Sequence, residues 1–164
     1  MPAHPYDILP LDNGAQLIFT PCPGTKGTNV DDSLTTLKDE KTAMLITLMF
    51  DQEIQENAVT VLPAACKKLG IQWVQLPILD DAAPGTEFES QWAKHKSDII
   101  ELINNKGTIA VHCKGGSGRT GLVIGLILLA LDWPAKEVIK TVQSIRPKAL
   151  SHPVQLEYFT RHVN

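Results

Sequence analysis

The sequence is poor in cysteine, and it has neither an excess of basic residues nor a long apolar segment. Its three cysteines, Cys22, Cys66 and Cys113, do not form an even disulfide framework, so we expect a reducing, cytoplasmic environment and at least one reactive thiol. Cys22 and Cys66 are expected to be buried core thiols, and a redox partnership with Cys113 is the alternative. The formal net charge of −3 argues against a nucleic-acid partner, because binding to a phosphate backbone normally requires clustered basic residues.

No apolar stretch of the sequence is long enough to cross a bilayer. The longest apolar run, residues 122–131, covers about half of a membrane span and predicts a buried core helix. The first residues lack the basic flank and apolar run of a secretory signal. The histidines and cysteines show no paired ligand spacing, so we expect no membrane partner, no metal and no cofactor.

The bulk composition is that of a soluble globular protein. The 164 residues are 43% hydrophobic and 20% charged, which suits a chain that buries its own core. We find no internal repeat or low-complexity segment, and the prolines and glycines are dispersed at turns rather than gathered in a linker. These features predict a single domain over residues 1–164, and we expect a monomer.

Apolar runs typical of strands alternate with stretches of helical periodicity. The predicted strands are residues 16–20, 43–49, 71–76 and 108–112, and the predicted helices are residues 32–40, 55–69, 87–104, 119–131, 135–145 and 153–162. This alternation predicts an α/β fold with a central, mostly parallel sheet of about four to five strands flanked by helices. Only helices follow residue 119, so the last strand delivers the next loop to the carboxyl edge of the sheet, where ligands bind.

The loop after this strand has the composition of a phosphate-binding loop. Residues 107–121 read GTIAVHCKGGSGRTG, in which glycines allow the backbone to turn its N–H groups toward one anion. The helix that follows adds its own free N–H groups. Cys113 opens the loop, where these donors favour the nucleophilic thiolate, and Arg119 closes it with a planar guanidinium that can grip two phosphate oxygens. The predicted phosphate-binding residues are Lys114, Gly115, Gly116, Ser117 and Gly118.

Two neighbours of this loop are expected to assist the chemistry. The hydroxyl of Thr120 can hydrogen-bond the thiolate and help it to leave when a phosphocysteine is hydrolysed. His112 is expected to orient the loop through its ring nitrogens rather than to act as a base, because the nucleophile is already activated.

The segment HCKGGSGRTG resembles the H-C-x-x-G-x-x-R-[ST]-G signature of the protein tyrosine phosphatase superfamily at every fixed position. The small size and the loop composition look most like dual-specificity phosphatases, and in particular the kinase-associated phosphatase group. A looser similarity extends from about Phe19 to Tyr158 through FTPCPGTK, LPILDDAAPG and SIRPKAL. The resemblance implies the fold of that superfamily and a phosphoprotein phosphatase that forms a phosphocysteine intermediate without a metal.

The same resemblance implies an aspartate on a mobile upstream loop that protonates the leaving oxygen. LPILDDAAPG offers Asp80 and Asp81, and Pro84 at the fourth position after Asp80 matches the D-x-x-x-P arrangement of the family, which favours Asp80. Gln155 is the candidate to position the attacking water, and an exposed helix glutamine is the alternative. Arg146 is expected to form an ion pair beneath the phosphate-binding loop.

Other functions are compatible with parts of the pattern. Gly116-x-Gly118-x-x-Gly121 resembles a dinucleotide-binding turn, but that motif needs a second strand where this sequence has another predicted helix. A phosphoinositide phosphatase stays an alternative, although lipid phosphatases of the superfamily carry two loop lysines and here only Lys114 is basic, with Ser117 at the second position. A catalytically silent phosphoprotein-binding module is the other alternative, and the sequence does not decide between phosphotyrosine and phosphoserine or phosphothreonine.

Overall fold

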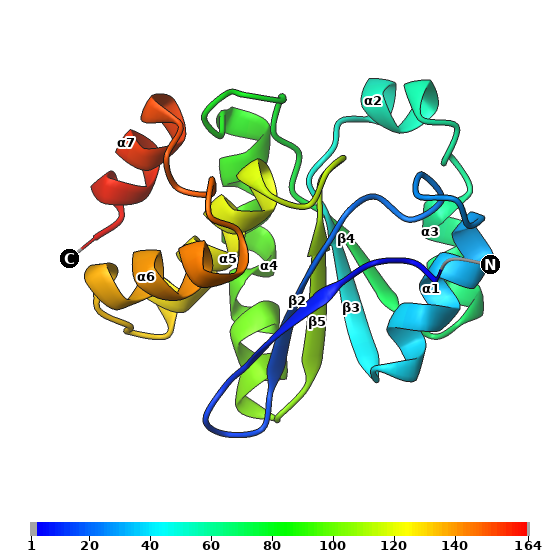
Figure 1. Cartoon of the computed structure of the whole chain (residues 1–164), viewed down its shortest axis with the longest axis horizontal. Coiled ribbons are helices and arrows are strands. Elements are labelled where there is room, and N and C mark those ends of the chain that lie inside the picture. The colour runs from blue at the N-terminus through cyan, green and yellow to red at the C-terminus, as the bar shows by residue number, and fades with distance from the viewer. Residues whose placement is uncertain (1–2, 164) are drawn as a thin grey trace.

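The computed structural model describes residues 3–163, which form a five-stranded sheet with helices on both faces (Figure 1). The strands are β1 (Asp7–Pro10), β2 (Gln16–Thr20), β3 (Thr42–Thr47), β4 (Gln72–Gln75) and β5 (Thr108–His112). Their order across the sheet is β1-β2-β5-β3-β4, so β5 lies at the centre. Only β1 runs antiparallel to its neighbour, and the predicted mostly parallel α/β sheet is confirmed.

The helices divide between the two faces of the sheet. They are α1 (Val30–Asp39), α2 (Asp51–Glu56), α3 (Leu62–Lys68), α4 (Thr86–Asn104), α5 (Gly118–Ala130), α6 (Ala135–Ile145) and α7 (Pro153–Arg161). Helices α1 and α3 cover one face, and α4 and α5 cover the other, with α6 and α7 packed on the outer side of α5 (Figure 1). In the described chain no helix is both long and apolar enough to cross a membrane.

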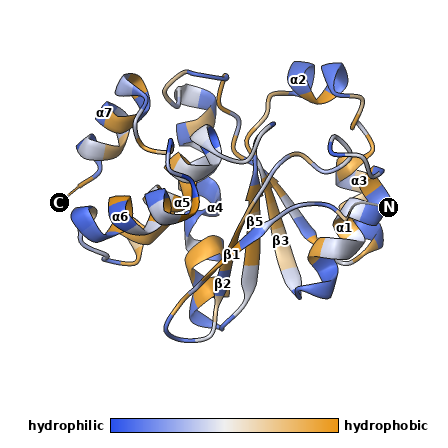
Figure 2. Cartoon of the chain, in the orientation of Figure 1, coloured by the Kyte–Doolittle hydropathy of each residue, from blue (hydrophilic) through white to orange (hydrophobic). Residues whose placement is uncertain are grey.

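Alternation along the central strands separates two hydrophobic clusters. Ile109 and Val111 of β5 face the larger cluster under α4 and α5, whereas Ala110 between them faces the smaller cluster under α1 and α3. Successive strand residues point to opposite faces, and both faces of a parallel sheet covered by helices are apolar. Hydrophobic residues accordingly gather along the central strands (Figure 2). This packing on both faces holds β5 in place, and with it the start of the next loop.

The predicted core helix is confirmed in α5. Residues 119–128 of this helix are all buried, and Gly121 allows α5 to approach the segment after α6, because a Cβ at Gly121 would lie 2.4 Å from the Cβ of Ala149. The close packing of α5 matters for function, because its first turn carries Arg119 and Thr120.

Two predictions of secondary structure are wrong. The single helix expected at residues 55–69 is divided into α2 and α3, because Ala58 adopts a left-handed conformation with φ of 57° and the amide of Val59 bonds back to Ile54. The sequence analysis also missed β1, a strand of four residues that ends in Pro10 and has only one buried residue. A strand this short carries little alternation, and its proline suits the edge of the sheet.

Candidate active site

The phosphate loop, defined here as residues 113–118, leaves the carboxyl end of β5 and enters the first turn of α5. Cys113 is 4% exposed and lies at the base of the loop. The amide of Gly116 donates to Sγ of Cys113 over 3.2 Å, and the hydroxyl of Thr120 donates to the same sulfur over 3.2 Å. The loop therefore curls back over Cys113, and two donors point at its sulfur, an arrangement suited to a thiolate.

Gly116 is the position at which the phosphate loop admits no side chain. Its φ is 82°, and an ideal Cβ there would lie 2.6 Å from the carbonyl carbon of Thr20 and 2.7 Å from the nitrogen of Pro21. The backbone after β2 therefore forms a wall against which the loop is pressed. Among the other predicted phosphate-binding residues, Lys114, Gly115 and Gly118 are exposed and Ser117 is half-buried.

Arg119 is buried, with 2% of its side chain exposed, beside the phosphate loop. Its Nη1 and Nη2 donate to the two carboxylate oxygens of Glu53 over 2.7 and 2.8 Å, and Nη1 also donates to the carbonyl of Ile78 over 3.0 Å. Burial by itself would lower the pKa of Arg119, but the hydrogen bonds to Glu53 and the charges of Cys113, Glu53 and Asp80 together outweigh this cost, and the pKa is raised. The guanidinium is thus held charged and in one orientation.

The Nε of Arg119 is buried and donates to no partner within residues 3–163. A buried donor without a partner is costly, and a phosphoryl oxygen bound in the adjacent loop would satisfy it. This orphaned donor is the observation that most directly indicates an oxyanion ligand.

Glu53 is a site residue that the sequence analysis missed. It lies in the first turn of α2, six residues after the end of the buried strand β3, and its side chain is 23% exposed. The only signal in the sequence was an acidic residue close after a buried strand whose end lies at the same edge of the sheet as β5. That signal has no fixed spacing to Arg119.

Asp80 lies on the acid loop, defined here as residues 76–85, which joins β4 to α4. Its side chain is 69% exposed, and its Oδ1 lies 3.6 Å from Nη2 of Arg119. Asp81 adopts a left-handed conformation with φ of 60°, and no hydrogen bond or ion pair joins it to the phosphate loop in the described chain. The structure therefore brings Asp80, and not Asp81, to Arg119.

His112 is joined to the phosphate loop by its ring. Its Nδ1 lies 2.9 Å from the carbonyl oxygen of Cys113, and its Nε2 lies 2.7 Å from the hydroxyl of Thr47 on β3. Complete burial lowers the pKa of His112 to about 4, so the ring is neutral near pH 7 and has one donor and one acceptor.

The carbonyl of Cys113 fixes the direction of this network, because a carbonyl oxygen can only accept. The neutral ring of His112 therefore carries its proton on Nδ1, and its Nε2 accepts from the Thr47 hydroxyl. The indole Nε1 of Trp73 on β4 donates to the same Thr47 oxygen over 2.8 Å and so helps to hold the hydroxyl in place. The prediction that His112 orients the loop by ring hydrogen bonds agrees with this geometry.

Gln155 lies between the two loops. It is 3% exposed on α7, its Nε2 donates to the carbonyl of Ala82 on the acid loop over 3.3 Å, and its Oε1 lies 3.7 Å from the position of a Cβ at Gly118. The alternative of an exposed helix glutamine does not describe this position.

Cys22 and Cys66 are both buried free thiols. Burial raises the pKa of each of them to about 12, which leaves them protonated near pH 7. They therefore differ from Cys113 in their surroundings, because neither sits in a loop of inward-facing donors.

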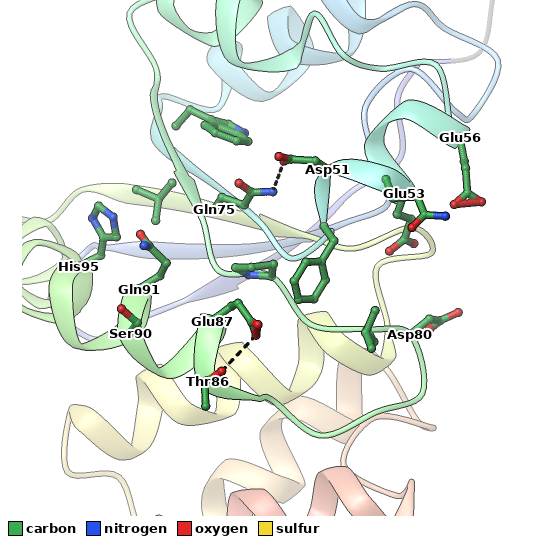
Figure 3. Close-up of a pocket in the computed structure, with 16 residues that line it drawn as sticks. Asp51, Glu53, Glu56, Gln75, Asp80, Thr86, Glu87, Ser90, Gln91 and His95 are labelled. Carbon is green, nitrogen blue, oxygen red and sulfur yellow. Dashed lines mark hydrogen bonds between the residues drawn. The ribbon is translucent and has the colours of Figure 1, made fainter.

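An open hollow of about 1160 Å³ lies next to the acid loop and shares Glu53 and Asp80 with the site (Figure 3). The residues that line it include Phe50, Trp73 and Pro77. The charged side chains that line it are all acidic: Asp51, Glu53, Glu56, Asp80 and Glu87. Within residues 3–163, no cluster of three or more histidines, cysteines and carboxylates could hold a metal ion.

Comparison with known proteins defines the class of protein. A family model described as "Polymorphic toxin system, DSP-PTPase phosphatase" matches residues 23–132, most of the chain, including Asp80, Cys113 and Arg119. The chain belongs to this family. The predicted membership of the cysteine-dependent protein tyrosine phosphatase superfamily, of dual-specificity type, is confirmed.

Two curated relatives show the same likeness over shorter segments. The tyrosine-protein phosphatase CDC14 homolog of Schizosaccharomyces pombe is 40% identical over 72 residues, which are 43% of this chain and 13% of that protein. The dual specificity protein phosphatase CDC14B of Mus musculus is 46% identical over 59 residues, which are 35% of this chain and 12% of that protein. The chain thus spans less than a fifth of either relative.

Solved structures match the fold over nearly the whole chain. Kinase associated phosphatase, solved with its catalytic-site cysteine substituted by serine, superposes with a TM-score of 0.84 at 21% identity and covers 96% of this chain and 93% of that one. Tk-PTP in its active form superposes with a TM-score of 0.71 at 22% identity and covers 89% of this chain and 90% of that one. At these identities the likeness concerns the fold.

Proposed function

We propose that this chain is a protein phosphatase that hydrolyses phosphotyrosine, and also phosphoserine or phosphothreonine, through a phosphocysteine on Cys113. The observation that carries the proposal is the arrangement around one loop. The Cys113 sulfur receives two hydrogen bonds, and the buried Arg119 beside it keeps an orphaned Nε donor. Such a site offers a nucleophile and a preorganised positive charge to the same phosphoryl group.

In the first step, the Cys113 thiolate attacks phosphorus in line with the leaving oxygen. The S–P bond forms as the P–O bond breaks, and protonated Asp80 gives its proton to the leaving oxygen. The phosphate loop amides and Arg119 stabilise the charge on the three equatorial oxygens. A serine, threonine or tyrosine oxygen leaves poorly as an anion, so this proton transfer is most important for protein substrates.

In the second step, water attacks the phosphocysteine and the S–P bond breaks. The Asp80 carboxylate takes a proton from the water, and Gln155 orients that water from its position between the two loops. The hydroxyl of Thr120 donates to the sulfur as it departs as a thiolate. Inorganic phosphate then leaves, and Asp80 is protonated for the next cycle. Neither step uses a metal or a cofactor.

The charge of the adjacent hollow supports a phosphoprotein substrate over a phosphoinositide. Its charged lining is wholly acidic, so additional phosphates on an inositol ring would be repelled there. Lys114 is the only basic residue of the phosphate loop. We further propose that residues 1–164 act as a single domain and as a monomer in the cytoplasm.

Turnover of an activated aryl phosphate tests the proposal. The wild-type chain should hydrolyse it, and Cys113→Ser should reduce kcat by at least about 10⁴-fold while it still binds phosphate. A wild-type chain that binds phosphate without turnover would be the silent binding module instead. Normal turnover by Cys113→Ser would rule out the phosphocysteine mechanism.

Side-by-side hydrolysis of a phosphotyrosine peptide, a phosphothreonine peptide and a phosphoinositide tests the substrate class. We expect kcat/KM to be highest for the phosphotyrosine peptide and lowest for the phosphoinositide. A preference for the phosphoinositide would overturn the substrate assignment and leave the chemistry of Cys113 in place.

A further inference from the structure

The phosphate loop is held from its outer side by an arginine that lies outside the matched residues 23–132. Arg146 follows α6, and its Nε donates to the carbonyl oxygen of Gly116 over 2.9 Å. Its Nη1 donates to Oδ2 of Asp7 over 2.6 Å and to the carbonyl of Ile145 over 3.2 Å. The expected ion pair beneath the loop is therefore present, and it is joined directly to the loop backbone.

The bond to Gly116 is placed to set the orientation of one amide in the loop. The two ends of a trans peptide unit point in opposite directions, so the Gly116 carbonyl and the Ser117 N–H lie on opposite sides of the chain. With the carbonyl turned toward Arg146, the Ser117 N–H is directed away from Arg146. The amide of Gly116 itself already donates to the Cys113 sulfur.

Asp7 and Phe19 fix the guanidinium that makes this bond. Asp7 lies on β1 directly opposite Phe19 of β2, and the Arg146 guanidinium carbon lies 5.6 Å from the centroid of the Phe19 ring. A planar guanidinium can bind a carboxylate on one edge, a carbonyl on another and a ring at its face. The antiparallel strand β1 thus brings the Asp7 carboxylate within hydrogen-bond distance of Arg146.

We propose that Arg146 and Asp7 are positioning residues for the phosphate loop. Arg146 holds the Gly116–Ser117 peptide so that the Ser117 N–H faces a bound oxyanion, and Asp7 holds Arg146. Neither side chain touches the reacting atoms, so both act through the backbone of the loop. For catalysis the inference rests on the proposed function, but for binding of an oxyanion it does not.

The test measures anion binding and turnover separately. Arg146→Met should weaken binding of inorganic phosphate, measured by titration calorimetry, by about tenfold and should lower kcat/KM for an aryl phosphate by a similar factor. Asp7→Asn should change both by about threefold in the same direction. Arg161→Met removes another arginine that lies over an aromatic ring, that of Tyr158 on α7, and should change neither by more than about twofold.

A double-mutant cycle separates positioning from general destabilisation. In an Arg146→Met background, Asp7→Asn should have no further effect on phosphate affinity, because its target is gone. If the two substitutions lowered phosphate affinity equally and independently, Asp7 would not act through Arg146, and the proposal would be overturned. An unchanged phosphate affinity in Arg146→Met would overturn it as well. If Arg146→Met melts below the assay temperature, Arg146→Lys serves instead, since it keeps the charge but not the planar fork, and should weaken phosphate binding about threefold.

If wild-type turnover is absent but phosphate binding follows the expected order, the proposed function fails and the positioning role stands. If wild-type turnover is present but Arg146→Met leaves the phosphate affinity unchanged, the proposed function stands and the positioning role fails.

Discussion

The two loops that meet at Arg119 are built in different ways. Contacts from several elements hold the backbone of the phosphate loop: Gly116 is pressed against the backbone after β2, the Cys113 carbonyl is bound by His112, and Arg146 binds the Gly116 carbonyl. The middle of the acid loop, residues 79–81, is exposed, with side-chain exposure of 69% at Asp80. Its anchors include the amide of Ile78 on the Leu48 carbonyl over 3.1 Å and Gln155 on the Ala82 carbonyl over 3.3 Å.

Because of this difference, substitutions in the two loops should affect activity in different ways. A rigid anion site stabilises the transition state of every phosphate monoester, because the phosphoryl group is common to all of them. An acid on an exposed segment matters in proportion to how poor the leaving group is. Substitutions that affect the phosphate loop should therefore reduce all activities together, and substitutions in the acid loop should separate substrates.

Among the substitutions that compare the two loops, the largest effect is expected from Arg119→Lys. A lysine keeps the charge but loses the bidentate contact with Glu53 and the Nε donor, so kcat should fall about 10³-fold. The fall should be the same, within about threefold, for an aryl phosphate and a phosphotyrosine peptide. Steady-state kinetics on both substrates make the measurement, and strongly unequal losses would show that Arg119 does more than bind the phosphoryl group.

Asp80→Asn should separate the two substrates. We expect a loss of about 10²-fold in kcat/KM for the phosphotyrosine peptide and of less than about tenfold for an aryl phosphate with a good leaving group. Asp81→Asn is the matched control, because asparagine tolerates the left-handed conformation at this position and should leave both rates unchanged. A larger loss in Asp81→Asn than in Asp80→Asn would exchange the assignment of the acid.

The phosphate loop could be predicted from sequence because its determinants are local. Cys113, Gly116, Arg119 and Thr120 lie within eight consecutive residues, and the strand before them is a short apolar run that can be recognised. The central strands β2 and β5 were predicted with their observed bounds for the same reason. Here local sequence and tertiary environment favour the same structure.

The partners of the loop could not be predicted because they are brought to it by the sheet. Glu53, Thr47 and Trp73 come from segments on the β3 and β4 side, and only the strand order places them beside β5. Asp7 lies on a strand too short to show a period, and its pairing with Arg146 joins the two ends of the chain. No spacing in the sequence encodes such contacts.

The buried underside of the phosphate loop should also be sensitive to pH. Burial lowers the pKa of His112 from its ordinary value of 6.5 to about 4, and that of His4 to about 4 as well. Between pH 6.5 and 4 the unfolded chain therefore binds more protons than the folded chain, and stability falls as the pH falls. For His112 the loss is roughly 2 kcal/mol at pH 5 relative to pH 7.5.

Urea unfolding followed by tryptophan fluorescence at pH 7.5 and pH 5 measures this loss. His112→Asn should lower stability at pH 7.5 but should reduce the pH dependence of stability, because one of the two buried imidazoles is removed. His162→Asn replaces an exposed histidine that directly follows α7 and should keep the wild-type dependence. The same pH dependence in His112→Asn as in the wild type would mean that His112 is not held neutral.

The smallest effect, and the sharpest test of how the phosphate loop is held, is expected from Trp73→Phe. The indole binds the Thr47 oxygen and restricts the rotation of its hydroxyl, so removal of the indole frees the hydroxyl to turn away from His112. The Nδ1–H bond to the Cys113 carbonyl should then be made only part of the time. We expect kcat/KM to fall about threefold for the aryl phosphate and the phosphopeptide alike.

The ring ¹⁵N shifts of His112 provide a readout that a general loss of stability would not change. In the wild type they should report a neutral ring protonated at Nδ1, and in Trp73→Phe the Nε2 shift should move toward that of a ring nitrogen with a weaker hydrogen bond. Trp133→Phe, in a half-buried tryptophan between α5 and α6, should leave the shifts and the rates unchanged. If the His112 shifts in Trp73→Phe equal those of the wild type, the indole does not hold the Thr47 hydroxyl against the ring, because an unchanged Nε2 shift requires an unchanged hydrogen bond from Thr47.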